Sequence, residues 1–142
     1  MFRNKAKSDI RITIKNGRTI DGLQAFLPNE EVRGEAEIIP ENDITVDAIR
    51  ARLVWYTQGR GDRDMGVVDT VTGPSGFLTG GVPVRMDFTL RLPSAPWSYA
   101  GQLITLVWAV QIVVDRDRGL DYDDDQPIIM TPTFETLDPF GS

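Results

Sequence analysis

The apolar segment Leu103–Val114 constrains the fold of this chain more than any other stretch of the sequence. It is much shorter than the about 20 apolar residues that a membrane-spanning helix needs. Its Leu, Ile, Val, Thr and Trp residues favour a strand over a helix. Every second residue from Ile104 to Val114 is apolar, whereas the residues between them are mixed. The pattern predicts a strand in the middle of a sheet, whose second face is covered by a loop, a tail or a partner.

Four further segments alternate between apolar and polar residues and are separated by turn residues rich in Gly, Pro and Asn. They are Ile10–Lys15, Val32–Ile38, Ile49–Tyr56 and Val84–Arg91. No long window has helical periodicity. We therefore predict an all-β fold, an antiparallel immunoglobulin-like β-sandwich of about 8 strands. It should occupy residues 10–131, between a basic tail at residues 1–9 and a C-terminal tail at residues 132–142 that could add an edge strand.

The composition narrows the classes of function. The net charge is −6, which argues against binding to nucleic acid. The chain has no histidine and no cysteine. Disulfides, thiol nucleophiles, histidine-based triads and nearly all zinc or copper sites are thereby excluded. An enzyme that uses only carboxylates stays open, but no motif indicates one, so we predict a protein without catalytic activity, cofactor or metal.

Charge is distributed unevenly along the chain. Residues 1–18 are mostly basic, whereas residues 115–125 are rich in aspartate. The simpler interpretation is a solvated tail and a solvated loop. The alternative is a tail that folds onto the acidic segment, within one molecule or between two. Calcium binding by the acidic segment also stays open, although Arg116 and Arg118 interrupt its aspartates.

Three stretches together resemble the arrestin family. The first, "LPNEEVRGEAEI", contributes Pro28, Glu30, Glu31, Val32 and Gly34. The second, "ITVDAIRARLVWYTQGRGDRD", is similar to the family's next strand and its glycine-bearing loop. The third begins "VRMDFTLRLPSAPWSYAG" and contributes Phe88, Leu92, Pro93, Pro96, Ser98, Tyr99 and Gly101. The chain has room for one sandwich where arrestins have two. The resemblance therefore implies a single arrestin-like sandwich of the sporulation-control type, without the receptor-binding cleft between two domains.

The stretch from Leu92 to Gly101 is predicted to connect the two sheets. Pro93 and Pro96 cannot donate hydrogen bonds to a sheet, so the chain should leave one sheet there. Trp97 and Tyr99 would then lie on or beside this connection. They either cover the open end of the core or form an exposed pair that anchors a partner.

Four arginines are a second candidate surface, because Arg50 and Arg52 project from one predicted strand and Arg85 and Arg91 from another. If the two strands share a sheet, these residues form a basic patch. Arginine is suited to bidentate contact with phosphate and carboxylate groups. The resemblance to arrestins implies that such a patch would bind phosphorylated or acidic tails.

Two further motifs lie outside these strands. In the C-terminal tail, Phe134 and Phe140 could bind a partner or add a strand to a sheet. The tripeptide Arg60-Gly61-Asp62 is read by some adhesion receptors, but the chain shows no secretory signal, so we expect an ordinary hairpin tip.

These observations favour a non-catalytic, cytoplasmic protein-binding or scaffold module without a transmembrane segment. Its expected partners are proteins, including further copies of itself that pair through sheet edges. The alternative is a carbohydrate-binding module that uses Trp55, Trp97 and Tyr99 as exposed aromatic rings.

Overall fold

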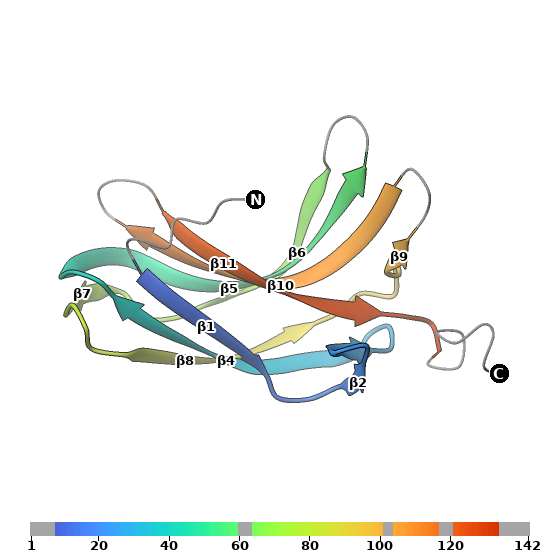
Figure 1. Cartoon of the computed structure of the whole chain (residues 1–142), viewed down its shortest axis with the longest axis horizontal. Coiled ribbons are helices and arrows are strands. Elements are labelled where there is room, and N and C mark those ends of the chain that lie inside the picture. Colours follow the sequence, from blue (N-terminus) through green and yellow to red (C-terminus); the bar gives the residue numbers. More distant parts are fainter. Residues whose placement is uncertain (1–7, 60–63, 101–103, 117–120, 134–142) are drawn as a thin grey trace.

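Two β-sheets stack face to face in the computed structural model, which describes residues 8–59, 64–100, 104–116 and 121–133 (Figure 1). The small sheet has the order β1-β4-β8, formed by β1 (Ser8–Ile14), β4 (Glu31–Pro40) and β8 (Val84–Arg91). The large sheet has the order β2-β3-β11-β10-β5-β6. Its strands are β2 (Arg18–Ile20), β3 (Leu23–Phe26), β11 (Tyr122–Met130), β10 (Ile104–Arg116), β5 (Ile44–Gly59) and β6 (Met65–Thr72).

Two short strands complete the large sheet: β7 (Gly76–Leu78) pairs with β5, and β9 (Tyr99–Ala100) pairs with β10. Every pair is antiparallel except β3 and β11, which are parallel. The described residues contain strands and no helix. The predicted fold class, an antiparallel β-sandwich, is therefore confirmed.

The core lies between the sheets and is built from the apolar parity of each strand. In β10 the inward residues Trp108, Val110, Ile112 and Val114 are fully buried, as the alternation predicted. In β4 the inward residues alternate with charged residues that face outward, giving a strict buried–exposed pattern over its first half. The same holds along β8. The inner faces of both sheets are therefore apolar. The outer faces differ between the two sheets.

Gly34 explains why the arrestin-like motif needs a glycine inside a strand. It pairs with Phe88 across β4 and β8. A Cβ atom at this position would lie 2.5 Å from the Phe88 ring and 2.5 Å from the carbonyl oxygen of Thr13. Because Gly34 has no Cβ atom, β1, β4 and β8 can lie close together here, with the Phe88 ring against the backbone of Gly34.

The connection after β8 carries the chain from the small sheet to the large sheet, as the prolines predicted. Buried Trp108 holds it in place, because its indole N–H donates to the carbonyl oxygen of Pro96 at 2.7 Å. Ser98 fixes the end of the connection through two hydrogen bonds with Met130: its N–H donates to the Met130 carbonyl, and its hydroxyl oxygen accepts from the Met130 N–H. The connection is thus tied to the core at two places.

One sequence prediction needs correction. Most of the acidic segment is not a loop, because β10 continues to Arg116 and β11 already begins at Tyr122. Tyr122 is buried in the core and anchors the start of β11. Among the described strands, β11 pairs at this end only with β10, since β3 pairs with Ile129 and Met130 alone. A strand edge next to solvent accommodates the aspartates that a central strand would exclude.

Candidate functional site

The four arginines do not form one patch. Arg50 and Arg52 lie in the large sheet, and Arg85 and Arg91 lie in the small sheet. Their strands also face outward on opposite sides of the sandwich, so the predicted continuous basic surface is wrong. The sequence could not reveal this, because it does not say which strands share a sheet. A role in partner binding for each arginine stays a prediction.

Three of these arginines are engaged in ion pairs. Arg50 binds Asp115 on the neighbouring strand β10 at 2.8 Å. In the small sheet, Arg85 binds Glu37 at 3.0 Å and Arg91 binds Glu31 at 3.2 Å. Cross-strand pairing therefore neutralises most of the positive charge that would attract an anionic tail.

Asp115 lies in a positively charged environment on the outer face of the large sheet, beside Arg50 and Arg52. A hydrogen bond from Arg50 lowers its pKa below the usual value, and the charge of Arg50 acts in the same direction. A hydrogen bond with Asp121 and the charge of Arg52 add to this lowering, whereas partial desolvation opposes it. The ion pair with Arg50 on the outer face of the large sheet thus favours the ionised form of Asp115.

The aspartates of the acidic segment are dispersed over two strands. Asp123 and Asp125 lie on the outward parity of β11, whereas Asp124 shares the parity of buried Tyr122. Among the residues that the structure describes, no three acidic side chains come together in a way that could hold a metal ion. Calcium binding therefore has no geometric support in this part of the chain.

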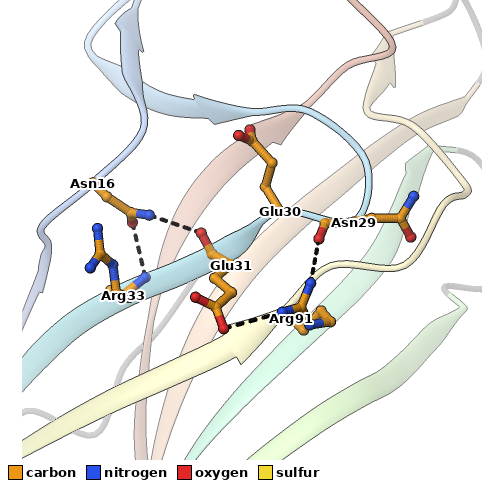
Figure 2. Close-up of a pocket in the computed structure, with 6 residues that line it drawn as sticks. All are labelled: Asn16, Asn29, Glu30, Glu31, Arg33 and Arg91. Carbon is orange, nitrogen blue, oxygen red and sulfur yellow. Dashed lines mark hydrogen bonds and ion pairs between the residues drawn. The ribbon is translucent and has the colours of Figure 1, made fainter.

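A shallow polar hollow of about 430 Å³ lies at one end of the small sheet, where the β1–β2 connection, the β3–β4 connection, the start of β4 and the end of β8 meet (Figure 2). It is lined by Asn16, Asn29, Glu30, Glu31, Arg33 and Arg91. Most of these residues hold the sandwich together. The Asn16 side chain donates to the Glu31 carbonyl and accepts from the Arg33 N–H, and Arg91 donates to the Asn29 carbonyl. Arg33 is exposed, and Figure 2 draws no interaction between its guanidinium group and the other residues that line the hollow.

The turn beside the hollow accounts for more of the arrestin-like motif. Asn29 adopts a left-handed conformation with φ of 67°, which asparagine tolerates better than most residues. The Glu30 carboxylate accepts from the Leu27 N–H at 2.6 Å and closes the turn. Sequence reasoning missed Asn16, whose side-chain amide joins the β1–β2 connection to β4. Its place after Ile14 and before a glycine suggests a turn but gives no sign of this bridge.

Trp97 is the one large aromatic side chain of the Leu92–Gly101 connection that the structure describes. It is 49% exposed, and its indole N–H donates to the carbonyl oxygen of Ser94 at 3.2 Å. Because its polar group is already satisfied, the ring offers an apolar surface. The side chain of Tyr99 lies outside the described set, as do Phe134, Phe140 and the Arg60-Gly61-Asp62 tripeptide.

Trp55 does not belong to an exposed aromatic surface of the kind that a sugar-binding module needs. This residue faces inward and packs against the main core cluster. Its indole also lies against Gly66, where an added Cβ would come within 2.5 Å of the Nε1 atom. Trp55 and Trp97 therefore do not present a shared flat surface to a sugar.

The edge of the large sheet gathers exposed apolar side chains. Strands β6 and β7 run end to end along the same side of β5, and Ile49 bridges them through backbone hydrogen bonds with Gly73 and Pro74. Six large apolar residues in the described part of the chain are exposed, and four of them lie on this β6–β7 edge. They are Met65, Val67, Val68 and Phe77.

Part of the β6–β7 edge is already closed. The Asp69 carboxylate accepts from the Arg91 N–H at the end of β8, which links the two sheets. The pairing of β5 and β6 also shifts between Leu53 and Val54, next to this contact. The exposed apolar side chains of the edge lie at the start of β6 and at Phe77 of β7.

Comparison with known proteins identifies the fold. No family model matches the chain, and no curated protein matches it. Among solved structures, Spo0M, the sporulation control protein from Bacillus subtilis, aligns with a TM-score of 0.67 over 87% of this chain. The chain has an arrestin-like β-sandwich fold. At 17% sequence identity the likeness shows the fold alone, and the chain spans about half of Spo0M, since the alignment covers 49% of it. Within the described residues, no helix has the length and hydrophobicity needed to cross a membrane.

Proposed function

We propose that this arrestin-like sandwich is a non-catalytic protein-binding or scaffold module. The observation that carries the proposal is the β6–β7 edge, where Met65, Val67, Val68 and Phe77 are 40–66% exposed. Apolar side chains along a strand edge suit the addition of a strand from another protein, whose backbone pairs with the edge and whose side chains cover it. Trp97 supplies a second apolar contact at the end of the sandwich.

The partner is expected to be an extended segment or an edge strand, because the exposed apolar side chains of the described residues lie mostly along a strand edge. A second copy of the chain is one such partner. Interface energy is usually concentrated in a few residues, aromatic ones above all, so Phe77 should contribute more than the valines of the edge. The cytoplasmic location predicted from the sequence stays a prediction.

The test compares edge variants with a matched variant on another face. Val67→Lys and Phe77→Lys place a charge on the edge, whereas Thr13→Lys places the same charge on the exposed face of the small sheet. Each purified protein is immobilised for capture from cell extract, and its mass is followed by light scattering over a range of concentrations. We expect the edge variants to lose a captured partner or a concentration-dependent mass that Thr13→Lys retains.

Two results would contradict the proposal. One is a wild-type protein that stays monomeric and captures nothing that the edge variants lose. The other is turnover of a small molecule that depends on one carboxylate. Loss of binding in Trp97→Ala alone would instead move the interface from the edge to the end of the sandwich.

A further inference from the structure

Charges on the outer face of the large sheet are ordered by strand. Arg50 and Arg52 have the outward parity of β5. Asp123 and Asp125 have the outward parity of β11, and β10 lies between these two strands. The outward residues in the middle of β10 are uncharged: Val107, Ala109, Gln111 and Val113. The face is therefore positive on one side of β10 and negative on the other.

The strand register aligns these charges in rows that cross the sheet. In each row an arginine of β5 and an aspartate of β11 are the direct neighbours of the same residue of β10. Adjacent strands are about 4.8 Å apart, so both charges lie at the same distance from β10. The two rows are Arg52–Gln111–Asp125 and Arg50–Val113–Asp123.

This arrangement is complementary to itself. In a symmetric dimer the same surface of both copies forms the interface. A two-fold axis that runs along β10, between two stacked large sheets, exchanges the two sides of the face without shifting the rows. It places Arg52 over Asp125 of the second copy. In the next row it places Arg50 over Asp123 of the second copy, while Arg50 also neutralises Asp115 of its own β10.

The same axis brings apolar and amide groups together at the centre of the face. Ala109 lies between Val54 and Pro127 in the register, and Val67 of β6 continues this row with 48% of its surface exposed. Gln111 would face Gln111 of the second copy. Its Oε1 atom is buried and accepts no hydrogen bond from the described residues, which is unfavourable. Two facing glutamine amides can each donate one hydrogen bond and accept another.

The described strands leave room for a second sheet. The small sheet lies on one side of the large sheet, and no described strand lies on the other side (Figure 1). Sheets that stack with their strands within about 30° of each other pack about 10 Å apart. Ala109 and Val113 are short enough for this approach at the centre, while the charged side chains lie at the rim. An uncharged centre with a polar rim is the usual anatomy of a protein interface.

We infer that a second copy of the chain stacks its large sheet on this face, so that two sandwiches form a symmetric dimer. The arginines of β5 in each copy bind the aspartates of β11 in the other. This interface uses the outer face of the sheet, whereas the proposed partner site is the β6–β7 edge. The inference therefore goes beyond the proposed function, and either can fail without the other.

An exchange of charge tests the contact. Arg52→Glu and Asp125→Arg are made singly and together in the full chain, and the Kd of dimerisation is measured by sedimentation equilibrium. We expect each single change to raise the Kd about tenfold or more, because like charges then face each other in two places. The double variant should return to within about threefold of the wild type, because opposite charges face each other again. Arg11→Glu makes the same change on the exposed outer face of the small sheet and should leave the Kd unchanged.

Three results would overturn the inference. One is a wild-type protein that stays monomeric at every concentration. Another is a double variant that dimerises no better than the single variants. The third is a dimer that Phe77→Lys abolishes and Arg52→Glu leaves intact, which would place self-association at the β6–β7 edge and agree with the proposed function. The unfolding transition of each variant is measured alongside, so that a folding defect is recognised.

A distance measurement tests the dimer without altering its charges, because the chain contains no cysteine. One spin label per molecule is attached at Thr70→Cys or at Thr89→Cys. Thr70 is exposed on β6, two strands from β10, and Thr89 is exposed on the outer face of the small sheet. From the strand and sheet spacings we expect about 20–25 Å between the Thr70 labels and about 30 Å or more between the Thr89 labels. Equal distances, or the opposite order, would contradict the stacking of the two large sheets.

Discussion

The outer faces of the two sheets differ in the charge and the burial of their side chains. The small sheet is apolar inside and charged outside, with Lys15 bridging Glu35 and Asp87 at 3.8 Å each. The large sheet is apolar inside and also buries Val54 and Ala109 on its outer face. A sheet with one solvated face needs strict alternation, whereas a sheet shielded on both faces does not. The comparison separates an outer face that is charged and exposed from one that carries a buried apolar cluster at its centre.

The largest expected effect comes from filling the space that Gly34 leaves beneath the Phe88 ring in the small sheet. Gly34→Val would place methyl groups against the Phe88 ring and the Thr13 carbonyl, where even a Cβ lies at 2.5 Å. We expect a loss of about 3 kcal/mol or more in the free energy of unfolding, measured by urea denaturation.

Gly22→Ala is the matched control, since no atom lies within 4 Å of the added Cβ. Its cost should be about 1 kcal/mol, because only its positive φ of 82° opposes the side chain. Similar losses in both variants would show that the close approach of β4 and β8 is not what requires Gly34.

Trp108 lies on the inner face of the large sheet, and its replacement tests the packing of that face. Trp108→Phe removes the indole that fills the core and the hydrogen bond to Pro96. We expect a loss of about 2 kcal/mol together with faster amide hydrogen exchange in the Leu92–Ser98 connection. An unchanged exchange rate in that connection would contradict its attachment through Trp108.

Asp115 gives a smaller, pH-dependent effect on the outer face of the large sheet. Its pKa is lowered in the folded state from the ordinary value of 3.8, so its carboxylate stabilises the fold fully above that pH. This stabilisation is lost as the pH falls below 3.8 and through the lowered pKa. Asp115→Asn should therefore be less stable than the wild type at pH 7, and the difference should disappear in acid. A difference that is the same at pH 7 and pH 2 would exclude the ionic origin.

The smallest expected effect belongs to the charged face of the small sheet. Arg91 and Glu31 form an ion pair whose side chains are 62% and 49% exposed. Exposed pairs of this kind contribute about 0.2–1 kcal/mol. A double-mutant cycle with Arg91→Gln and Glu31→Gln should give a coupling energy near the lower end, and salt should reduce it further. A coupling above about 2 kcal/mol would mean that the small sheet relies on its outer face as the large sheet does.

Much of the fold was predictable, because alternation along β4 and β8 and the apolar run of β10 report burial directly. The start of β11 was not, since its aspartates indicate a loop by propensity and Tyr122 alone anchors them in the sheet. The prediction of an arginine patch was wrong for another reason. The sequence indicates on which face of a strand a residue lies, but it does not assign strands to sheets. The hydrogen bonds of Asn16 and Asp69 depend on contacts between distant strands and leave no local signal.

The central claim is that the centre of the outer face of the large sheet, around Val54, Tyr56 and Ala109, is buried, whereas the outer face of the small sheet is solvated. Its most direct test compares Val54→Lys with Thr13→Lys by urea denaturation of the otherwise intact chain. Both changes add one lysine to an outward position, and only Val54 is buried. We predict that Val54→Lys lowers the free energy of unfolding by about 2–4 kcal/mol and that Thr13→Lys changes it by less than about 0.5 kcal/mol. Equal effects of less than about 0.5 kcal/mol would contradict the claim, because they would show that both outer faces are open to water.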